Sequence, residues 1–378
     1  IKKDIYFLSP NFFFFDTLFK TMQKLIHSPE KLKNALDELK NKDQLNEYIN
    51  RVDNHGDTLV HFAARSHSLK VLRMLKEEYG ADFTVINEHG RQALHEAIDS
   101  IDCVSYIISN CNVDVNALKR GDWTPVMIAA LKGRLDIIQA LEKAGANLDL
   151  ANKDGRTALH LAIQHGHVEA SKYLAQRSPS SINKSTKSGR LPIQIAAAYT
   201  IEGEEPQQKA KRDIWYDLTT FLFLNHVKTS LAHRDKSGRG LLQDAAVSQN
   251  LPLVRFLLTQ GADPNQVDSI GRNVIHHAAM MGHLNLLELL FKQDQEQSKG
   301  NDDKKQEIGR FDWDVPDRWD EWTPLMHASR QGHFPIVQFL VQHGLTQKNF
   351  RDKHGRKAKD IGKRFFFICS LVYGTIMT

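Results

Sequence analysis

A short four-residue phrase recurs nine times along the chain at a nearly constant spacing. In a clear copy it reads Thr157-Ala158-Leu159-His160. The first residues of the copies are Thr58, Gln92, Thr124, Thr157, Leu191, Gly240, Asn273, Thr323 and Lys357. The steps between them are 34, 32, 33, 34, 49, 33, 50 and 34 residues. Such a period predicts a solenoid of stacked units, because each unit is too small to bury its apolar face alone.

The residues around each phrase predict a turn followed by two antiparallel helices. In the fourth copy, Asp154-Gly155 favours a tight turn, because glycine tolerates a positive φ. Thr157 is a good cap for the first helix, and Gly166 is a typical residue just after its end. Val168 then starts the second helix. The phrase and its period resemble the ankyrin repeat. The resemblance implies an all-α repeat solenoid of about nine helix-turn-helix units with β-hairpin fingers, plus an N-terminal capping half-repeat.

The spacing also divides the chain into segments. We expect a non-native or disordered leader over 1–21, capping helices over 22–52, the repeat array over 53–362 and an apolar tail over 363–378. The two long steps place insertions near 201–213 and 293–309. Both are charged or polar, so we expect solvated loops there. The apolar runs at the two ends are shorter than the roughly 20 residues of a spanning helix, which predicts no membrane segment.

The composition and motifs argue against an enzyme. The net charge of +5 is mild, and the three cysteines form no CxxC pair, which suits a reducing compartment. No phosphate-binding loop or nucleophile elbow occurs. We interpret the histidines of the phrase, such as His61 and His95, as structural, since the ring can bond the capping residue and local backbone. We therefore expect no cofactor, no metal, a monomer alone, and a cytoplasmic location with the nucleus as second compartment.

The turns before the first helices, which we call fingers, are rich in charge and tryptophan. Basic residues recur there, and stacking should align them along one edge, which favours an acidic partner. They are Arg91, Arg120, Arg156, Arg190, Arg239 and Arg272. Another finger carries Trp313, Trp319 and Trp322, for which an interface and internal packing are equally good interpretations. No stacking platform of aromatics interleaves with the basic residues, which disfavours direct nucleic-acid binding.

Several stretches resemble one family more specifically. Gly56-Asp57-Thr58-Leu59-Val60-His61, Leu118-Lys119-Arg120-Gly121-Asp122-Trp123-Thr124-Pro125 and Asn152-Lys153-Asp154-Gly155 are similar, in the same order, to ankyrin repeat domain-containing protein 16 and its relatives. That resemblance implies a non-enzymatic cofactor that binds the catalytic domain of alanyl-tRNA synthetase and captures misactivated serine on lysine side chains.

The lysines of that family carry over only in part. Lys153 matches one directly. Where that family has two consecutive lysines, this chain has Lys119 followed by Arg120, so only Lys119 remains as a lysine. The third position falls near Asn183, with Lys184 adjacent. The candidate acceptors are therefore Lys119, Lys153 and Lys184. The alternative is a scaffold for an acidic protein partner through the basic fingers.

Overall fold

The computed structural model describes residues 18–199, 206–225, 231–299 and 311–362. It forms two compact units, Ile1–Lys184 and Ser185–Thr378, which we call the N-terminal and C-terminal units. The expected apolar tail over 363–378 and the first 17 residues of the expected leader lie outside the described residues.

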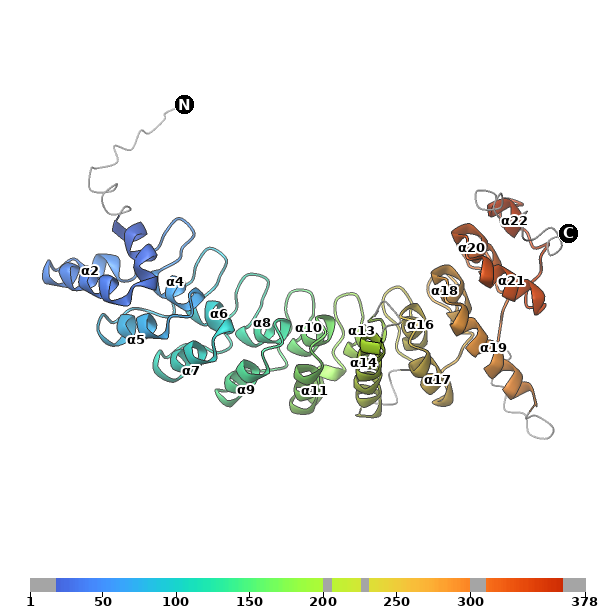
Figure 1. Cartoon of the computed structure of the whole chain (residues 1–378), viewed down its shortest axis with the longest axis horizontal. Helices are drawn as coiled ribbons and strands as arrows, with labels where there is room; N and C mark the ends of the chain where they lie inside the picture. Colours follow the sequence, from blue (N-terminus) through green and yellow to red (C-terminus); the bar gives the residue numbers. More distant parts are fainter. Residues whose placement is uncertain (1–17, 200–205, 226–230, 300–310, 363–378) are drawn as a thin grey trace, which may run out of the picture. The chain divides into compact units, whose positions relative to one another are not determined.

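The N-terminal unit is built from pairs of short helices joined by fingers that all lie on one side (Figure 1). The inner helices are α4 (Leu59–Arg65), α6 (Ala93–Glu96) with the 3₁₀ turn η2 (Ala97–Asp99), α8 (Pro125–Leu131) and α10 (Ala158–Gln164). The outer helices are α5 (Leu69–Glu77), α7 (Ile101–Asn110), α9 (Leu135–Lys143) and α11 (Val168–Arg177). Each inner helix packs on its own outer helix, and α4, α6 and α8 each also pack on the inner helix of the next repeat.

Further short elements complete this unit at its two ends. They are η1 (Leu25–His27), α2 (Pro29–Asn41), α3 (Leu45–Tyr48) and, after the last pair, α12 (Pro179–Ile182). Residues 18–24 are helical, and Phe19 and Met22 are buried with 2% and 0% of their surface exposed. Phe19 therefore belongs to the folded unit, although its position in the sequence placed it in the expected leader.

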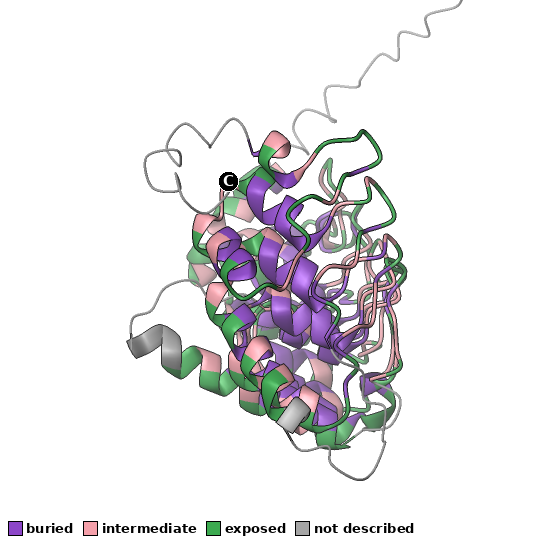
Figure 2. Cartoon of the chain, turned by 90° about the vertical axis from the view of Figure 1, so that its right-hand side faces the viewer, coloured by how far each residue is buried: buried purple, intermediate pink, exposed green. Residues whose placement is uncertain are grey.

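The C-terminal unit repeats the same pairing. Its inner helices are α13 (Pro192–Ala197), α16 (Leu241–Val247), α18 (Val274–Met281) and α20 (Pro324–Gln331), followed by the short α22 (Ala358–Ile361). Its outer helices are α14 (Pro206–Asn225), α17 (Leu251–Thr259), α19 (Leu284–Lys299) and α21 (Phe334–Gln342). The buried positions lie on the sides of the helices that face each other (Figure 2).

The two insertions lengthen outer helices instead of forming loops throughout. Residues 206–213 belong to α14, which starts at Pro206, a residue whose fixed φ suits a first helical turn. Residues 293–299 likewise continue α19. The expectation of solvated loops was therefore wrong for these parts, because polar sequence without a breaker can extend a helix that is already anchored by its buried residues. The remaining residues, 201–205 and 300–309, lie outside the described ranges.

At His61, His95 and His276 the last residue of the phrase links its repeat to the next one. The Nδ1 atom of His61 accepts a hydrogen bond from the backbone N–H of Thr58 at 3.2 Å, as the structural interpretation predicted. Its Nε2 atom lies 2.9 Å from the carbonyl oxygen of Arg91 in the next finger. Since a carbonyl only accepts, the ring carries its proton on Nε2. A ring held in this way thus caps the start of its own helix and forms a hydrogen bond to the next repeat.

Glutamine takes the place of this histidine in two repeats and keeps both bonds. The Oε1 atom of Gln194 accepts from the backbone N–H of Leu191 at 3.1 Å, and its Nε2 atom donates to the carbonyl of Arg239 at 3.0 Å. Gln243 does the same with Gly240 and Arg272, at 2.6 and 3.1 Å. A glutamine amide therefore makes the same two hydrogen bonds as the neutral imidazole, and no titratable group is required at this position.

Candidate functional site

Eight of the nine fingers are held by the side chain of their first residue. In the second finger, the Oδ1 atom of Asn87 accepts hydrogen bonds from the backbone N–H groups of His89 and Arg91, both at 2.9 Å. Short polar side chains commonly hold turns in this way. In eight fingers the side-chain oxygen of the first residue accepts a hydrogen bond from a backbone N–H group of the same finger. These first residues are Asp53, Asn87, Asn152, Thr186, Asp235, Asp268, Asp317 and Asp352.

The third finger, residues 119–123, is the exception. Its first residue is Lys119, whose ammonium group cannot accept a hydrogen bond. The N–H of Lys119 donates to the carbonyl of Trp123 at 2.9 Å, as in the other fingers, and here the N–H of Trp123 also donates back to the carbonyl of Lys119 at 3.4 Å. Gly121 and Asp122 adopt positive φ values of 85° and 63°. The backbone has taken over the turn, so the Lys119 side chain has no part in holding it.

The Lys119 side chain lines an open groove of about 420 Å³ in the N-terminal unit. We call it the Lys119 groove. Its walls come from the second and third fingers and from the inner helices α4, α6 and α8. The lining residues are Arg65, Arg91, His95, Glu96, Asp99, Lys119, Trp123, Ile128, Leu131 and Lys132.

Lys119 differs from the other cations of the groove in its electrostatic surroundings. Its Nζ atom lies 4.8 Å from the centroid of the Trp123 ring, and among the described residues no carboxylate forms an ion pair with it. Partial burial lowers the pKa of Lys119 below its ordinary 10.5, and the nearby charge of Arg91 lowers it further, while Glu96 opposes the shift. The amine is therefore easier to deprotonate than that of an ordinary lysine.

The remaining cations of the groove are neutralised by carboxylates. Arg91 pairs with Glu96 at 3.1 Å. Arg65 bridges Glu96 and Asp57, at 3.2 and 2.9 Å. Lys132 pairs with Asp99 at 2.6 Å. Lys119 is the one lining cation without such a partner in the described part of the chain.

The other two candidate lysines lie outside the groove. Lys153 is exposed at the tip of the fourth finger, where its backbone N–H bonds to the carbonyl of Gly121. Lys184 is half-buried and its ammonium donates to the backbone carbonyl of Asp149, whose carboxylate lies 3.7 Å away. The Lys184 ammonium is thus engaged by a hydrogen bond and an ion pair, whereas the Lys119 ammonium has neither in the described part of the chain.

The finger arginines do not form a free cationic row. Asp244 is fully buried and lies 3.2 Å from Arg190 and 3.5 Å from Arg239. Arg272 pairs with Asp317 at 3.2 Å, and Arg91 is paired as described. Arg120 is exposed and donates to the backbone carbonyl of Glu88 at 3.0 Å. For Arg156 the described part of the chain shows no ion pair. Two of the pairs, Arg190 with Asp244 and Arg272 with Asp317, join different repeats, and sequence reasoning could not foresee them.

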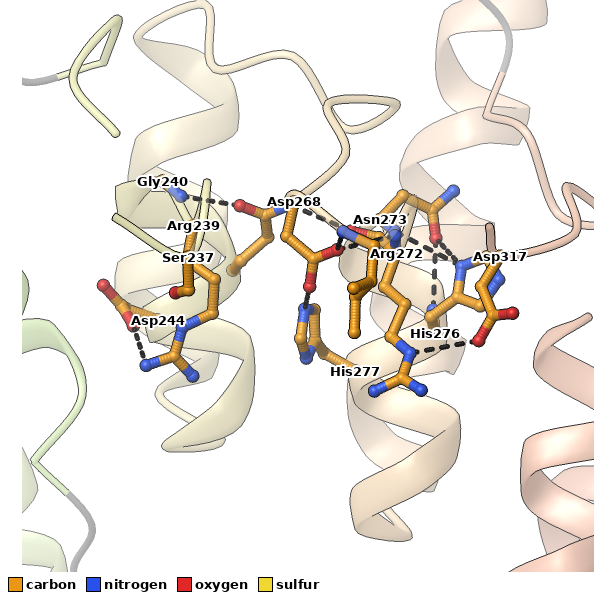
Figure 3. A network of polar contacts seen from close by, with 12 residues as sticks. Ser237, Arg239, Gly240, Asp244, Asp268, Arg272, Asn273, His276, His277 and Asp317 are labelled. Carbon is orange, nitrogen blue, oxygen red and sulfur yellow. Dashed lines mark hydrogen bonds and ion pairs between the residues drawn. The ribbon is translucent and has the colours of Figure 1, made fainter. Parts of the chain in front are cut away.

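Buried carboxylates, histidines and arginines also tie the inner helices of the C-terminal unit together (Figure 3). His277 lies 3.2 Å from Asp268, and His327 lies 2.9 Å from Asp317. Burial alone would raise the pKa of Asp317, but the hydrogen bond from His327 and backbone N–H groups lower it to about 2. Burial lowers the pKa of His327. Each carboxylate thus has a histidine or an arginine as its partner. The pair of Arg272 with Asp317 joins two repeats, so the network stabilises their stacking.

The three tryptophans of the eighth finger have different surroundings. Trp313 is 6% exposed and donates to Asp294 at 2.9 Å. Trp322 donates to Asp352 at 3.0 Å. Trp319, at 67% exposed, projects from the finger. Packing thus accounts for Trp313 and Trp322, and Trp319 is the member of the set that is open to a partner.

The sequence contained a signal for the groove that we did not use. Comparing the first residue of each finger would have singled out Lys119 as the one that cannot accept a hydrogen bond. The residue after the last residue of the phrase also varies, being Glu96, Ile128 and Leu161 in successive repeats. Two of these three, Glu96 and Ile128, line the groove.

Stacked helix pairs with an open groove beside their fingers define a repeat protein of the solenoid class, which holds other proteins. Family models for ankyrin repeats match residues 25–119 and 102–188 (three copies), 242–291 (many copies) and 320–353 (one repeat). The chain belongs to the ankyrin repeat family, and the predicted all-α repeat solenoid is confirmed. It is accordingly a protein-binding module. Within the described residues the fingers form turns and one isolated β-bridge, without a sheet.

Curated relatives share the repeats over part of their length. Protein glp-1 of Caenorhabditis elegans is 32% identical over 164 residues, which are 39% of this chain and 12% of that protein. Rabankyrin-5 of Homo sapiens is 26% identical over 272 residues, which are 66% of this chain and 23% of that protein. The chain therefore spans less than a quarter of these relatives.

Among solved structures, the ankyrin repeat domain of Bcl-3, titled a unique member of the IkappaB protein family, aligns with a TM-score of 0.49 and 22% identity. The alignment covers 63% of this chain and all of that domain. Within the described ranges, no helix has the length and apolar character to cross a bilayer. Nor does any cluster of three or more histidine, cysteine or acidic side chains in those ranges have the arrangement of a metal site.

Proposed function

We propose that this ankyrin repeat protein is a translation-fidelity cofactor that binds the catalytic domain of alanyl-tRNA synthetase and captures misactivated serine. The observation that carries the proposal is the state of Lys119: half-buried in a groove, without a carboxylate partner among the described residues, and with a lowered pKa. The segment from Leu118 to Pro125, which resembles the cofactor family, is the segment that contains this lysine.

The chemistry requires a neutral amine beside a reactive acyl group. An ordinary lysine, with a pKa of about 10.4, is neutral in only about one molecule in 10³ to 10⁴ at neutral pH, and each unit of lowering raises that fraction about tenfold. The Nζ atom attacks the carbonyl carbon of seryl adenylate, an amide bond forms, and AMP leaves. The amine loses its proton to water. Docking beside the synthetase supplies the proximity that the small neutral fraction needs.

The three candidate lysines differ in how well they suit this role. Lys119 suits it best. Lys153 is exposed on the adjacent finger and is the second choice. Lys184 is the weakest, because its ammonium already donates to the carbonyl of Asp149 and would lose that bond on acylation. The site of action is the cytoplasm, with the nucleus as second compartment.

The test combines the protein with alanyl-tRNA synthetase, serine and ATP, and maps seryl adducts by mass spectrometry. We expect a complex and an adduct on Lys119, then on Lys153. Omitting ATP should abolish adducts, since no adenylate forms. Lys119→Arg keeps the positive charge but should remove the adduct at that position, because guanidinium stays protonated. Absence of both a complex and adducts would overturn the proposal.

The alternative, a scaffold for an acidic protein through the basic fingers, has less support. Arg91, Arg190, Arg239 and Arg272 are all engaged by carboxylates of the same chain. A row of paired arginines carries little free charge for a partner. A pull-down that recovers acidic proteins but no synthetase would favour the scaffold.

A further inference from the structure

The Lys119 groove combines one unpaired cation with an apolar wall. The ion pairs of Arg65, Arg91 and Lys132 leave Lys119 as the lining cation that an incoming anion can neutralise without breaking an existing pair. Arg91 is close enough to repel the Lys119 ammonium. An anion bound at Lys119 would offset that repulsion, so the groove is electrostatically complementary to one negative group.

The apolar part of the groove lies beside this cation. Trp123 stands under the Lys119 ammonium, and Ile128 and Leu131 follow on the inner helix α8. Ile128 and Leu131 are half-buried, so each still presents surface to solvent. Because Ile128 and Leu131 are three residues apart, they lie on the same side of α8, about one turn apart. An aliphatic side chain next to the anion would therefore find a matching wall.

The departure of the third finger shows that its turn does not require this lysine. Eight fingers use their first side chain as an acceptor for the turn, and this one has in its place one additional backbone bond, from the N–H of Trp123 to the carbonyl of Lys119. Asp122 adopts a left-handed conformation, which aspartate tolerates better than most residues. The Lys119 side chain, which the turn does not use, lines the groove.

We infer that the Lys119 groove is a docking site for an acidic peptide segment of a partner protein. A Glu or Asp carboxylate of the segment pairs with the Lys119 ammonium, and an aliphatic neighbour packs on Trp123, Ile128 and Leu131. The inference rests on the protein-binding function proposed above and adds the chemistry of recognition. It also implies regulation, because an ion pair stabilises the ammonium form. A docked acidic segment would therefore suppress acylation of the Lys119 amine.

The experiment measures protection of single lysines in the full chain. The protein is acetylated with acetic anhydride at about pH 8, below the ordinary lysine pKa, and each lysine is followed by mass spectrometry. The probe is the N-acetylated, C-amidated peptide Gly-Leu-Glu-Leu-Gly at millimolar concentration, and its matched control carries Gln in place of Glu. We expect the Glu peptide to slow acetylation of Lys119 about fivefold, as one favourable ion pair allows. The Gln peptide should have little effect, and Lys153 should be acetylated at the same rate throughout.

Direct binding provides a second readout. A fluorescent form of the Glu peptide should lose about fivefold in affinity for Lys119→Gln and keep it for Lys143→Gln, at an exposed position of the outer helix α9. Circular dichroism confirms that both variants are folded. Equal protection by the Gln peptide, equal protection of Lys153, or protection by an RNA oligonucleotide but not by the peptide would each overturn the inference. Protection without seryl adducts overturns the cofactor proposal alone, whereas adducts without protection overturn the docking site alone.

Discussion

The ammonium group of Lys119 lies over the ring of Trp123, with 4.8 Å between Nζ and the ring centroid. The two residues also exchange the backbone hydrogen bonds that close the third finger. An aromatic face attracts a cation, so Trp123 holds the lysine in the groove, while burial and Arg91 disfavour its charge. The balance leaves an amine that is held in position and has a pKa below that of an ordinary lysine.

The first prediction concerns the charge that acts on Lys119. Because Arg91 lowers the pKa of Lys119, Arg91→Met should move that pKa upward, and the Glu96 carboxylate, then paired with Arg65 alone, acts in the same direction. The pH profile of Lys119 acetylation measures it: the midpoint lies below 10.5 in the parent protein and rises in the variant. Arg120→Met is the control, since Arg120 points to the carbonyl of Glu88. A downward shift in Arg91→Met would contradict the electrostatic account.

The second prediction concerns His95, which caps α6. Burial lowers the pKa of His95 to about 4 from its ordinary 6.5. The unfolded chain therefore binds a proton near pH 6.5 and the folded chain only near pH 4. The neutral ring contributes its full stability above pH 6.5, and that stability is lost as the pH falls through this window. The loss amounts to about 3 kcal/mol at most.

His95→Gln tests this assignment, because the chain itself uses glutamine at the equivalent Gln194 and Gln243. Urea unfolding should show nearly parent stability at pH 7 and a flatter decline toward pH 4.5. His95→Leu leaves the N–H of Gln92 and the carbonyl of Ala117 without their partner. It should cost about 2–4 kcal/mol at pH 7. An unchanged pH dependence in His95→Gln would show that another group is responsible.

The third prediction separates two glycines with similar backbone angles. Gly90 has φ of 72°, and a Cβ atom there would lie 2.8 Å from the backbone nitrogen of Arg120 in the next finger. Gly145 has φ of 90° and no atom within 4 Å of such a Cβ. Gly145→Ala should therefore cost about 1 kcal/mol, the left-handed strain alone. Gly90→Ala should cost about 2 kcal/mol more, since the contact between fingers must shift. Equal losses in thermal unfolding would contradict the steric argument.

The fourth prediction compares tryptophans of one finger. Trp313→Ala empties a buried site and removes the hydrogen bond to Asp294, so it should cost about 3–5 kcal/mol in unfolding experiments. Trp319→Ala removes an exposed ring and should change stability by no more than about 0.5 kcal/mol. If Trp319→Ala proved as damaging as Trp313→Ala, the ring would have a structural role that its exposure does not suggest.

The sequence by itself determined the repeat. The spacing of the phrase, its capping residues and the glycines after the inner helices depend on interactions within about ten residues, which are visible in the chain as written. The same reasoning identified the phrase histidines as structural. It also selected Lys119, Lys153 and Lys184 as candidates, without any means of ranking them.

The tertiary structure decided which side chains are free. Arg190 and Asp244 lie on either side of an insertion, and Arg65 and Glu96 belong to different repeats, yet each pair is in contact. An ion pair depends on a distance of a few ångströms, and repeat spacing does not fix that distance. Stacking brings a carboxylate of another repeat to Arg190 and Arg272, and likewise to the groove cations Arg65 and Lys132, and leaves Lys119 beside Trp123. That difference in partners, invisible in the sequence, separates the candidate site from its neighbours.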